Sequence, residues 1–289
     1  MRGMRWLAAA AGIFAILVLG TTPDGRASSL QGTIAYSGFY STAIRGTMHY
    51  AVYVPPDYAT SGKRYPVVYF LHGLPANATT YRNVQQVAQA VEQSGHEAIV
   101  VSVQGARAGE TDPEWLDAGP GHDWETATAV QLVSTIDNRY RTIAQRAGRL
   151  LIGISAGGYG ATMIALHHPS TFAVVESWSG YFHATTPDGT APLDLGSEEA
   201  NDWANAHKLI PNVKRMLSLD APKTYFAFYV GTNDSLFRTE NEQFYAQLRK
   251  AGIYRVVFEI YKGAHDWSLW GAHDSQWLGA GLAVAAKPV

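Results

Sequence analysis

Short apolar runs separated by longer amphipathic stretches organise most of the chain. Four runs are rich in β-branched or aromatic residues and end at Gly, His or Ser: residues 67–71, 98–103, 149–152 and 224–230. Such nearly continuous apolar runs are typical of strands buried on both faces of a parallel sheet. Stretches of helical length lie between them, at residues 80–94, 125–140, 156–168 and 239–251. This alternation predicts an α/β fold, with a mostly parallel central sheet and helices on both of its faces.

Two parts of the pattern depart from this alternation. Residues 33–40 and 47–54 alternate in a strand-like way, which predicts an antiparallel opening to the sheet. Residues 181–222 separate two strand candidates, are rich in Gly, Pro, Asp and Trp, and have only a weak helical pattern at 198–209. We expect residues 181–222 to form a cap or substrate-binding insertion.

The first thirty residues differ from the rest. Two arginines precede an uncharged run over residues 6–20, and a polar stretch follows. This is the order of a secretory signal, and the apolar run is shorter than the roughly 20 residues of a membrane span. Small residues at Gly25 and Ala27 suit cleavage after Ala27. We expect a signal peptide at 1–27 and one domain at 28–289, with an uncleaved membrane anchor as the alternative.

The composition narrows the class of protein. Hydrophobic residues make up 47% and charged residues 16% of the 289, so the chain can bury a large core. A net charge of -2 without a dense Lys/Arg run argues against a nucleic-acid partner. The sequence has no cysteine, which excludes disulfides and thiolate metal sites. Export without disulfides is expected more often of a bacterium than of a eukaryote, in a secreted or cell-envelope protein.

A Gly-x-Ser-x-Gly pattern carries the strongest chemical signal. Gly153-Ile154-Ser155-Ala156-Gly157 follows a predicted strand and precedes a predicted helix. In that context the pattern is a nucleophile elbow, a sharp turn that exposes the serine and tolerates only small neighbours. We therefore expect Ser155 to be a catalytic nucleophile.

A serine nucleophile needs a histidine base, and the base needs a carboxylate. The histidines after the serine are His167, His168, His183, His207, His265 and His273. The first two end the nucleophile helix, where a role at its C-terminus is expected. His265 follows the predicted strand 254–261 and a turn, at the end of the strand where catalytic groups gather in α/β sheets. We expect His265 to be the base, with His273 as the reserve and a helix-capping role as the alternative.

The acid should lie between the serine and the histidine in the chain. Asp234 follows the strand 224–230, again at its carboxyl end. Asp266 adjoins the histidine and could hardly fold back onto its ring, and Glu240 lies in the next helix. Asp234 is therefore the candidate acid, with a helix N-cap or Asx turn as its alternative.

Acyl transfer also needs backbone N–H donors for the oxyanion. Ala156, directly after the nucleophile, offers one donor, and the loop after the early strand should offer the second. That loop reads Leu71-His72-Gly73-Leu74-Pro75, in which Leu74 is the candidate donor because proline has no N–H. We expect His72 to brace this loop by hydrogen bonding.

With these motifs the sequence resembles the esterase family that contains S-formylglutathione hydrolases, feruloyl and acetyl-xylan esterases, and the mycobacterial antigen 85 mycolyltransferases. The resemblance rests on residues 65–74, 123–126, 137–142, 153–157, 231–234 and 263–267. It implies an α/β-hydrolase fold. By the same resemblance, the mycolyltransferases use a glutamate acid and lack the His-Gly pair. Asp234 and His72-Gly73 therefore favour the esterase branch.

The leading hypothesis is a secreted serine carboxylic ester hydrolase that works through an acyl-enzyme, without metal or organic cofactor. A secreted acyltransferase with the same triad is the alternative, and a non-catalytic binding protein that retains the fold is the third. We expect a small-molecule, glycan or lipid ester as substrate, and infer neither a nucleic-acid nor an obligate protein partner.

Aromatic residues near the predicted site suggest how a substrate would be held. Trp267 and Trp270 follow the candidate base within one helical turn. The insertion contributes Tyr181, Phe182 and Trp203. Large aromatic faces suit an apolar acyl group, an aromatic ring or a sugar ring. We expect Trp267 to bind substrate, with core packing under the last helix as the alternative.

Overall fold

The computed structural model describes residues 30–110, 114–186, 190–219 and 222–289. These residues contain one eight-stranded sheet. The strands follow the order β1-β2-β4-β3-β5-β6-β7-β8. Their bounds are β1 (Thr33–Ser41), β2 (Gly46–Val54), β3 (Val67–Leu71), β4 (Ile99–Val103), β5 (Arg149–Ile154), β6 (Val174–Trp178), β7 (Tyr225–Gly231) and β8 (Val257–Tyr261). β1 and β2 pair antiparallel with their neighbours, and strands β3 to β8 are parallel. The α/β-hydrolase fold expected from the sequence is confirmed.

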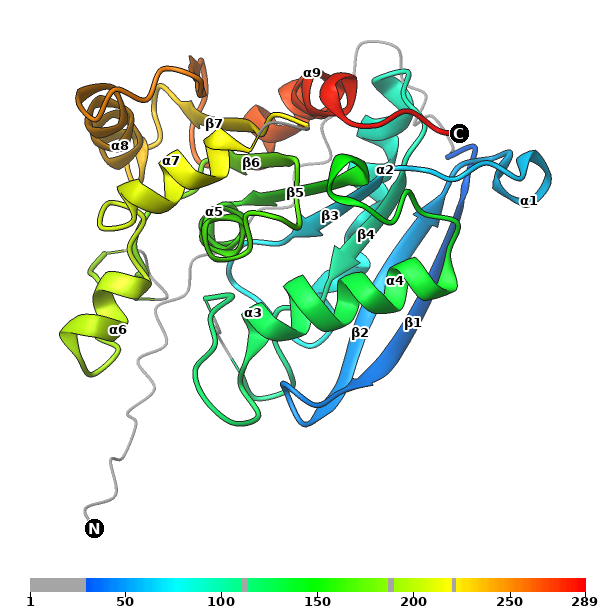
Figure 1. Ribbon diagram of the computed structural model, residues 1–289, viewed down its shortest axis with the longest axis horizontal. Helices are drawn as coiled ribbons and strands as arrows, with labels where there is room; N and C mark the ends of the chain where they lie inside the picture. The colour runs from blue at the N-terminus through cyan, green and yellow to red at the C-terminus, as the bar shows by residue number, and fades with distance from the viewer. Residues whose placement is uncertain (1–29, 111–113, 187–189, 220–221) are drawn as a thin grey trace.

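Helices cover both faces of the sheet (Figure 1). The helical segments are α1 (Tyr58–Ser61), the 3-10 turn η1 (Thr80–Arg82), α2 (Val84–Gln93), α3 (Trp124–Thr126), the π-helical η2 (Ala127–Leu132), α4 (Val133–Arg139), the 3-10 turn η3 (Arg146–Gly148), α5 (Ala156–His167), α6 (Glu198–Trp203), α7 (Ile210–Ser218), α8 (Arg238–Lys250) and α9 (Trp267–Val284). α2 and α9 pack over one face, and α4, α5, α7 and α8 pack over the other. The sheet is thus sandwiched between two hydrophobic cores.

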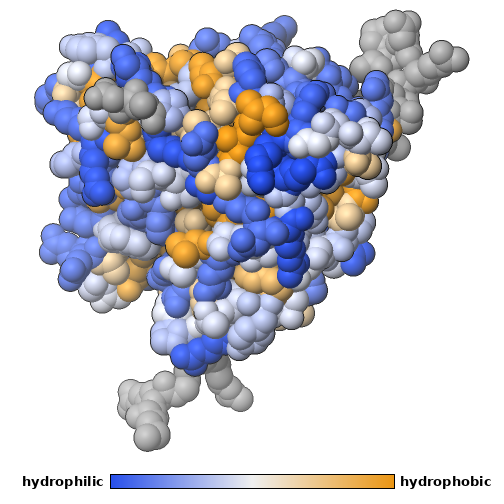
Figure 2. Space-filling model, turned by 45° about the vertical axis from the view of Figure 1, so that its right-hand side comes forward, coloured by the Kyte–Doolittle hydropathy of each residue, from blue (hydrophilic) through white to orange (hydrophobic). Residues whose placement is uncertain are grey.

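The surface is mixed in character. On the face shown in Figure 2, hydrophilic residues predominate and hydrophobic residues form smaller patches between them. Within residues 30–289, apart from the three short gaps, no helix has the length and apolar character needed to cross a membrane. The expected signal peptide, residues 1–27, lies outside the described residues.

The secondary structure differs from the sequence pattern in two places. β6 is not among the predicted strands, because Glu176 interrupts its apolar run. The weak helical pattern over 198–209 contains one short helix in the structure, and a second helix begins directly after it. α6 ends at Trp203, and α7 begins at Ile210 with Pro211 in its first turn, where proline needs no N–H partner. That residues 181–222 form a cap stays a prediction.

The turn from β5 into α5 lies very close to the neighbouring strand. A Cβ atom on Gly157 would lie 2.0 Å from the carbonyl oxygen of Leu71, at the end of β3. A Cβ atom on Gly153 would lie 2.0 Å from the carbonyl oxygen of Gly157. Only glycine fits at these two positions, because each faces a backbone atom that cannot move aside. The nucleophile helix therefore begins directly above the sheet.

A glutamate is buried in the middle of the sheet. Glu176 of β6 is fully buried, and its Oε2 accepts a hydrogen bond from Trp178 Nε1 at 2.9 Å. Its Oε1 has no hydrogen-bond partner among the described residues, and Gly281 of α9 packs closely against it. Burial raises the pKa of Glu176 to about 8, against the lowering effect of the Trp178 hydrogen bond.

We expect Glu176 to make the protein less stable as the pH rises from 4.5, the ordinary pKa of glutamate, to about 8. In this window the unfolded state has released the proton while the folded state keeps it. The free energy of unfolding therefore falls, by at most about 1.4 kcal/mol per pH unit. Glu176→Gln cannot ionise and should remove this slope in thermal melts at several pH values. The exposed Glu259→Gln should retain the slope, and a slope unchanged in Glu176→Gln would contradict this origin.

We expect Gly157→Ala to destabilise the fold by about 1 to 3 kcal/mol or more, because the added methyl group overlaps backbone of β3. Gly271 of α9 is a matched control, since nothing lies within 4 Å of the Cβ that alanine would add there. Gly271→Ala should be neutral or stabilise by up to about 1 kcal/mol, because alanine is the better helix former. Urea denaturation measures both changes. Equal effects of the two substitutions would show that the close approach does not constrain the turn.

Candidate active site

Three predicted residues meet at the carboxyl edge of the sheet. Ser155 follows β5, Asp234 follows β7 and His265 follows β8. His265 Nε2 lies 3.0 Å from Ser155 Oγ, and His265 Nδ1 lies 2.8 Å from Asp234 Oδ2. An ionised Asp234 can only accept, so Nδ1 carries the proton and Nε2 is left to accept the hydroxyl hydrogen. The geometry is therefore that of a hydroxyl, a base and an acid in line.

The backbone at Ser155 is unusual for a residue with a side chain. Ser155 has φ 53° and ψ -122°, a region that non-glycine residues rarely adopt. Its N–H donates to the carbonyl of Trp178 in β6 at 2.9 Å, which fixes the turn to the neighbouring strand. The strained turn places the hydroxyl above the sheet edge, beside the imidazole.

Asp234 uses its two carboxylate oxygens for different tasks. Oδ1 accepts hydrogen bonds from the backbone N–H groups of Leu236 and Phe237, at 3.1 and 3.0 Å. Oδ2 faces His265. An Asx turn was the alternative to a role as the acid. The structure contains this turn, and Asp234 also contacts the histidine. The turn prevents the carboxylate from rotating away from the imidazole.

Two aromatic rings contact the imidazole of His265. Phe237 and Trp270 each lie with their ring centroid 5.2 Å from that of His265, both in edge-to-face arrangements. Phe237 comes from the loop that carries the acid, and Trp270 from the first turn of α9. Such pairs are favourable beyond their buried area. The imidazole is thus held by packing as well as by its two hydrogen bonds.

The loop after β3 lies against Ser155. A Cβ atom on Gly73 would lie 2.9 Å from the Cβ of Ser155. His72 is buried, with Nε2 accepting from the N–H of Gly105 at 3.1 Å and Nδ1 lying 3.0 Å from the carbonyl of Gly73. Burial lowers the pKa of His72 to about 4, so the ring is neutral at neutral pH and braces the loop as expected. The oxyanion role of Leu74 stays a prediction.

Ala156 is the first residue of α5, so its N–H has no partner within the helix. This position suits an oxyanion donor, and the role of Ala156 also stays a prediction. Within the described residues, no group of three or more His, Asp or Glu side chains is arranged to hold a metal ion.

The reserve base and the helix-end histidines lie elsewhere. The ring of His273 contacts Tyr261 and Trp277, not the serine. His167 Nδ1 and His168 Nε2 both bind the buried carboxylate of Glu125, at 2.9 and 3.0 Å. Burial alone would raise the pKa of Glu125, but the two imidazoles hold it below its ordinary value. Both histidines lie at the C-terminus of α5 as expected, and they also share a carboxylate partner that the sequence did not indicate.

The aromatic residues divide into exposed and core positions. Trp267 is 39% exposed, and its ring contacts Trp270. Tyr181 and Phe182 are core residues, so the expectation that they line a pocket is wrong. Trp203 stacks on His167, at the end of α5 that is remote from the serine. The expectation that Trp203 lines a pocket is therefore also wrong. Substrate binding by Trp267 stays a prediction.

Sequence reasoning missed two buried polar residues beside the site. Ser179 Oγ accepts from Trp270 Nε1, and Asn241 donates from Nδ2 to the carbonyls of Gly180 and Phe237. No motif marks these residues, because their partners come from elements distant in the sequence. The only signal is a polar residue at a position where the surrounding pattern expects an apolar one.

Comparison with known proteins gives the family of the chain. A family model described as "Putative esterase" matches residues 41–273. Esterase Rv1288 of Mycobacterium tuberculosis (strain ATCC 25618 / H37Rv) is 34% identical over 146 residues, which cover 50% of this chain and 32% of that protein. The match thus spans about a third of the length of this curated relative. Diacylglycerol acyltransferase/mycolyltransferase Ag85B of Mycobacterium avium is 24% identical over 251 residues, 75% of this chain and 74% of the relative.

Solved structures share the fold. A ferulic acid esterase superposes with a TM-score of 0.72 at 23% identity, covering 89% of this chain and 99% of the other. An S-formylglutathione hydrolase from Agrobacterium tumefaciens gives 0.72 at 18% identity, covering 90% and 98%. Since the family model matches most of the chain, from Ser41 at the end of β1 to His273 in α9, the chain belongs to the esterase family.

Proposed function

We propose that this chain hydrolyses carboxylic esters through an acyl-enzyme on Ser155. The observation that carries the proposal is the unbroken hydrogen-bond series from Asp234 through His265 to the serine hydroxyl. A serine hydroxyl is a poor nucleophile at neutral pH, and a histidine oriented by a carboxylate is the arrangement that activates it.

In the first half-reaction, His265 Nε2 takes the hydroxyl proton as Ser155 Oγ forms a bond to the ester carbonyl carbon. The resulting oxyanion receives hydrogen bonds from the N–H groups of Ala156 and Leu74, each worth roughly 3 to 4 kcal/mol. The ester C–O bond then breaks, and the leaving alcohol takes the proton from His265. Asp234 stays ionised and stabilises the imidazolium.

In the second half-reaction, a water molecule replaces the alcohol. His265 removes a proton from water as the water oxygen attacks the acyl carbon, and returns that proton to Ser155 Oγ as the acid leaves. A sugar hydroxyl in place of water gives an acyltransferase by the same steps. The similarity to a mycolyltransferase over three quarters of the chain supports this second candidate. We also propose export through residues 1–27.

A fluorophosphonate should label the protein once, at Ser155, because only an activated serine beside oxyanion donors reacts quickly. Mass spectrometry of the labelled protein gives both stoichiometry and position. Ser155→Ala should not react. Persistent labelling of that variant, or absence of labelling in the wild type, would refute the proposed nucleophile.

His265→Ala should lower kcat by about 10,000-fold on a p-nitrophenyl ester, because the proton transfer is lost. Asp234→Asn should lower kcat somewhat less. The amide can still accept from Leu236 and Phe237 but favours the wrong imidazole tautomer. His273→Ala is the matched control and should stay within about twofold of the wild type. If His273→Ala inactivates a folded protein and His265→Ala does not, the base is misassigned.

Trp267→Ala should lower kcat/KM for long acyl esters more than for acetate, by on the order of 1 to 3 kcal/mol, because apolar contact with the chain is lost. A series of p-nitrophenyl esters, with and without a sugar acceptor, measures the preference and separates hydrolysis from transfer. Trp203 is similarly exposed, at 36%, but stacks on His167. Trp203→Ala should leave the chain-length preference unchanged. An equal loss on every ester in Trp267→Ala would mark a structural residue.

A further inference from the structure

The carboxyl end of β6 contributes no member of the triad, yet it contacts the segments that carry all three. The carbonyl of Trp178 accepts from the N–H of Ser155. The two residues that follow, Ser179 and Gly180, are linked to the base and the acid indirectly, through side chains that lie between them. We call Trp178, Ser179 and Gly180 the β6 hub.

The contact toward the base runs through an indole. Ser179 Oγ accepts from Trp270 Nε1 at 3.1 Å, and the bond is buried. The Trp270 ring lies edge-to-face with His265. Trp270 has one polar atom, so this single hydrogen bond fixes the rotation of the indole and, with it, the surface that the imidazole packs against.

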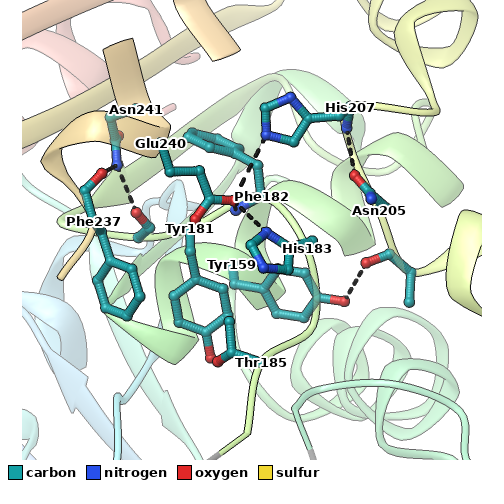
Figure 3. A network of polar contacts seen from close by, with 12 residues as sticks. Tyr159, Tyr181, Phe182, His183, Thr185, Asn205, His207, Phe237, Glu240 and Asn241 are labelled. Carbon is teal, nitrogen blue, oxygen red and sulfur yellow. Dashed lines mark hydrogen bonds and ion pairs between the residues drawn. The ribbon is translucent and has the colours of Figure 1, made fainter. Parts of the chain in front are cut away.

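The contact toward the acid runs through α8. Asn241 donates from Nδ2 to the carbonyl of Gly180 at 2.7 Å and to that of Phe237 at 2.9 Å (Figure 3). The N–H of Phe237 binds Asp234, and the Phe237 ring packs on His265. Both aromatic neighbours of the imidazole are therefore tied to adjacent residues of one strand end.

The backbone of Ser179 has a conformation that favours glycine, yet the residue has a side chain that makes a buried hydrogen bond. Ser179 is fully buried and has φ 48°, where glycine would fit without steric cost. Its N–H donates to the carbonyl of Tyr229 at 2.7 Å, which holds the strained conformation. A serine in this position keeps a side-chain acceptor that glycine would lack.

We propose that Ser179 and Trp270 are positioning residues that hold the His265 imidazole while the serine is acylated. This inference rests on the proposed function. In the free enzyme the ring has hydrogen bonds at both nitrogens. In the acyl-enzyme Ser155 Oγ has no hydrogen to donate, so Asp234 and the aromatic contacts alone keep Nε2 directed at the water. Small misplacements of a catalytic group cost large factors in rate.

Trp270→Phe removes the indole N–H and keeps a ring, and Ser179→Ala removes the acceptor. Each should lower kcat on the order of tenfold, with KM within about twofold. Stopped-flow measurement should show deacylation slowed more than acylation. Labelling of Ser155 should stay at one per chain. Because both substitutions break one bond, the double variant should lose about as much as either single variant.

Two controls separate positioning from stability. Ser179→Gly also lacks the hydroxyl but relieves the backbone, so it should match Ser179→Ala in kcat even if their melting temperatures differ. Trp277 is a buried tryptophan of α9 whose ring contacts Trp178, Tyr229 and Tyr261 but not His265. Trp277→Phe should retain kcat within about twofold at a comparable loss of stability.

The proposal is overturned if Ser179→Ala and Trp270→Phe retain wild-type kcat, if their effects multiply in the double variant, or if Trp277→Phe is equally slow. These outcomes differ from failure of the proposed function itself. In that case the wild type would neither hydrolyse the esters nor be labelled at Ser155, whatever happens at Ser179 and Trp270.

Discussion

The start of α5 lies so close to β3 that it leaves no room for a side chain at Gly157, and the site depends on this constraint. Gly157 lies against the backbone of Leu71, and the chain leaves the sheet by a sharp turn at Ser155 that permits this close approach. That turn sets the height of the hydroxyl above the sheet edge. The acid and the base then need only loops that end at the same edge, which parallel strands β7 and β8 supply.

Rigidity around the imidazole comes from several weak contacts rather than one strong interaction. Asp234 is held by two backbone N–H groups while it holds His265, and two aromatic rings pack on the imidazole. Each of these contacts is modest in free energy, but together they restrict rotation of the ring. Such restriction is what turns a histidine near a serine into a base of fixed geometry.

The proximity of Ser155, Asp234 and His265 could be predicted from the sequence because each of them follows a motif with a mechanism. Gly153 to Gly157 requires a strand-turn-helix context, and the order serine, acid, histidine leaves few candidates. The β6 hub could not be predicted, since Ser179 meets Trp270 only through tertiary packing. β6 was not predicted because the buried carboxyl group of Glu176 interrupts the apolar pattern of this strand. Tyr181 and Phe182 were misplaced because an aromatic residue looks the same in sequence whether it lines a pocket or fills a core.

The helix that follows Ser155, α5, is buried nearly all round. Of the twelve residues of α5, eleven are buried, and only His167 at its end is partly exposed. A helix so enclosed cannot accept larger side chains on any face without disturbing the sheet or the helices that cover it. New substrate preferences would therefore have to arise outside this helix, for example at the start of α9, where Trp267 is exposed. The residues that can change to alter substrate preference are thus separate from the residues of α5, where substitutions would disturb the fold.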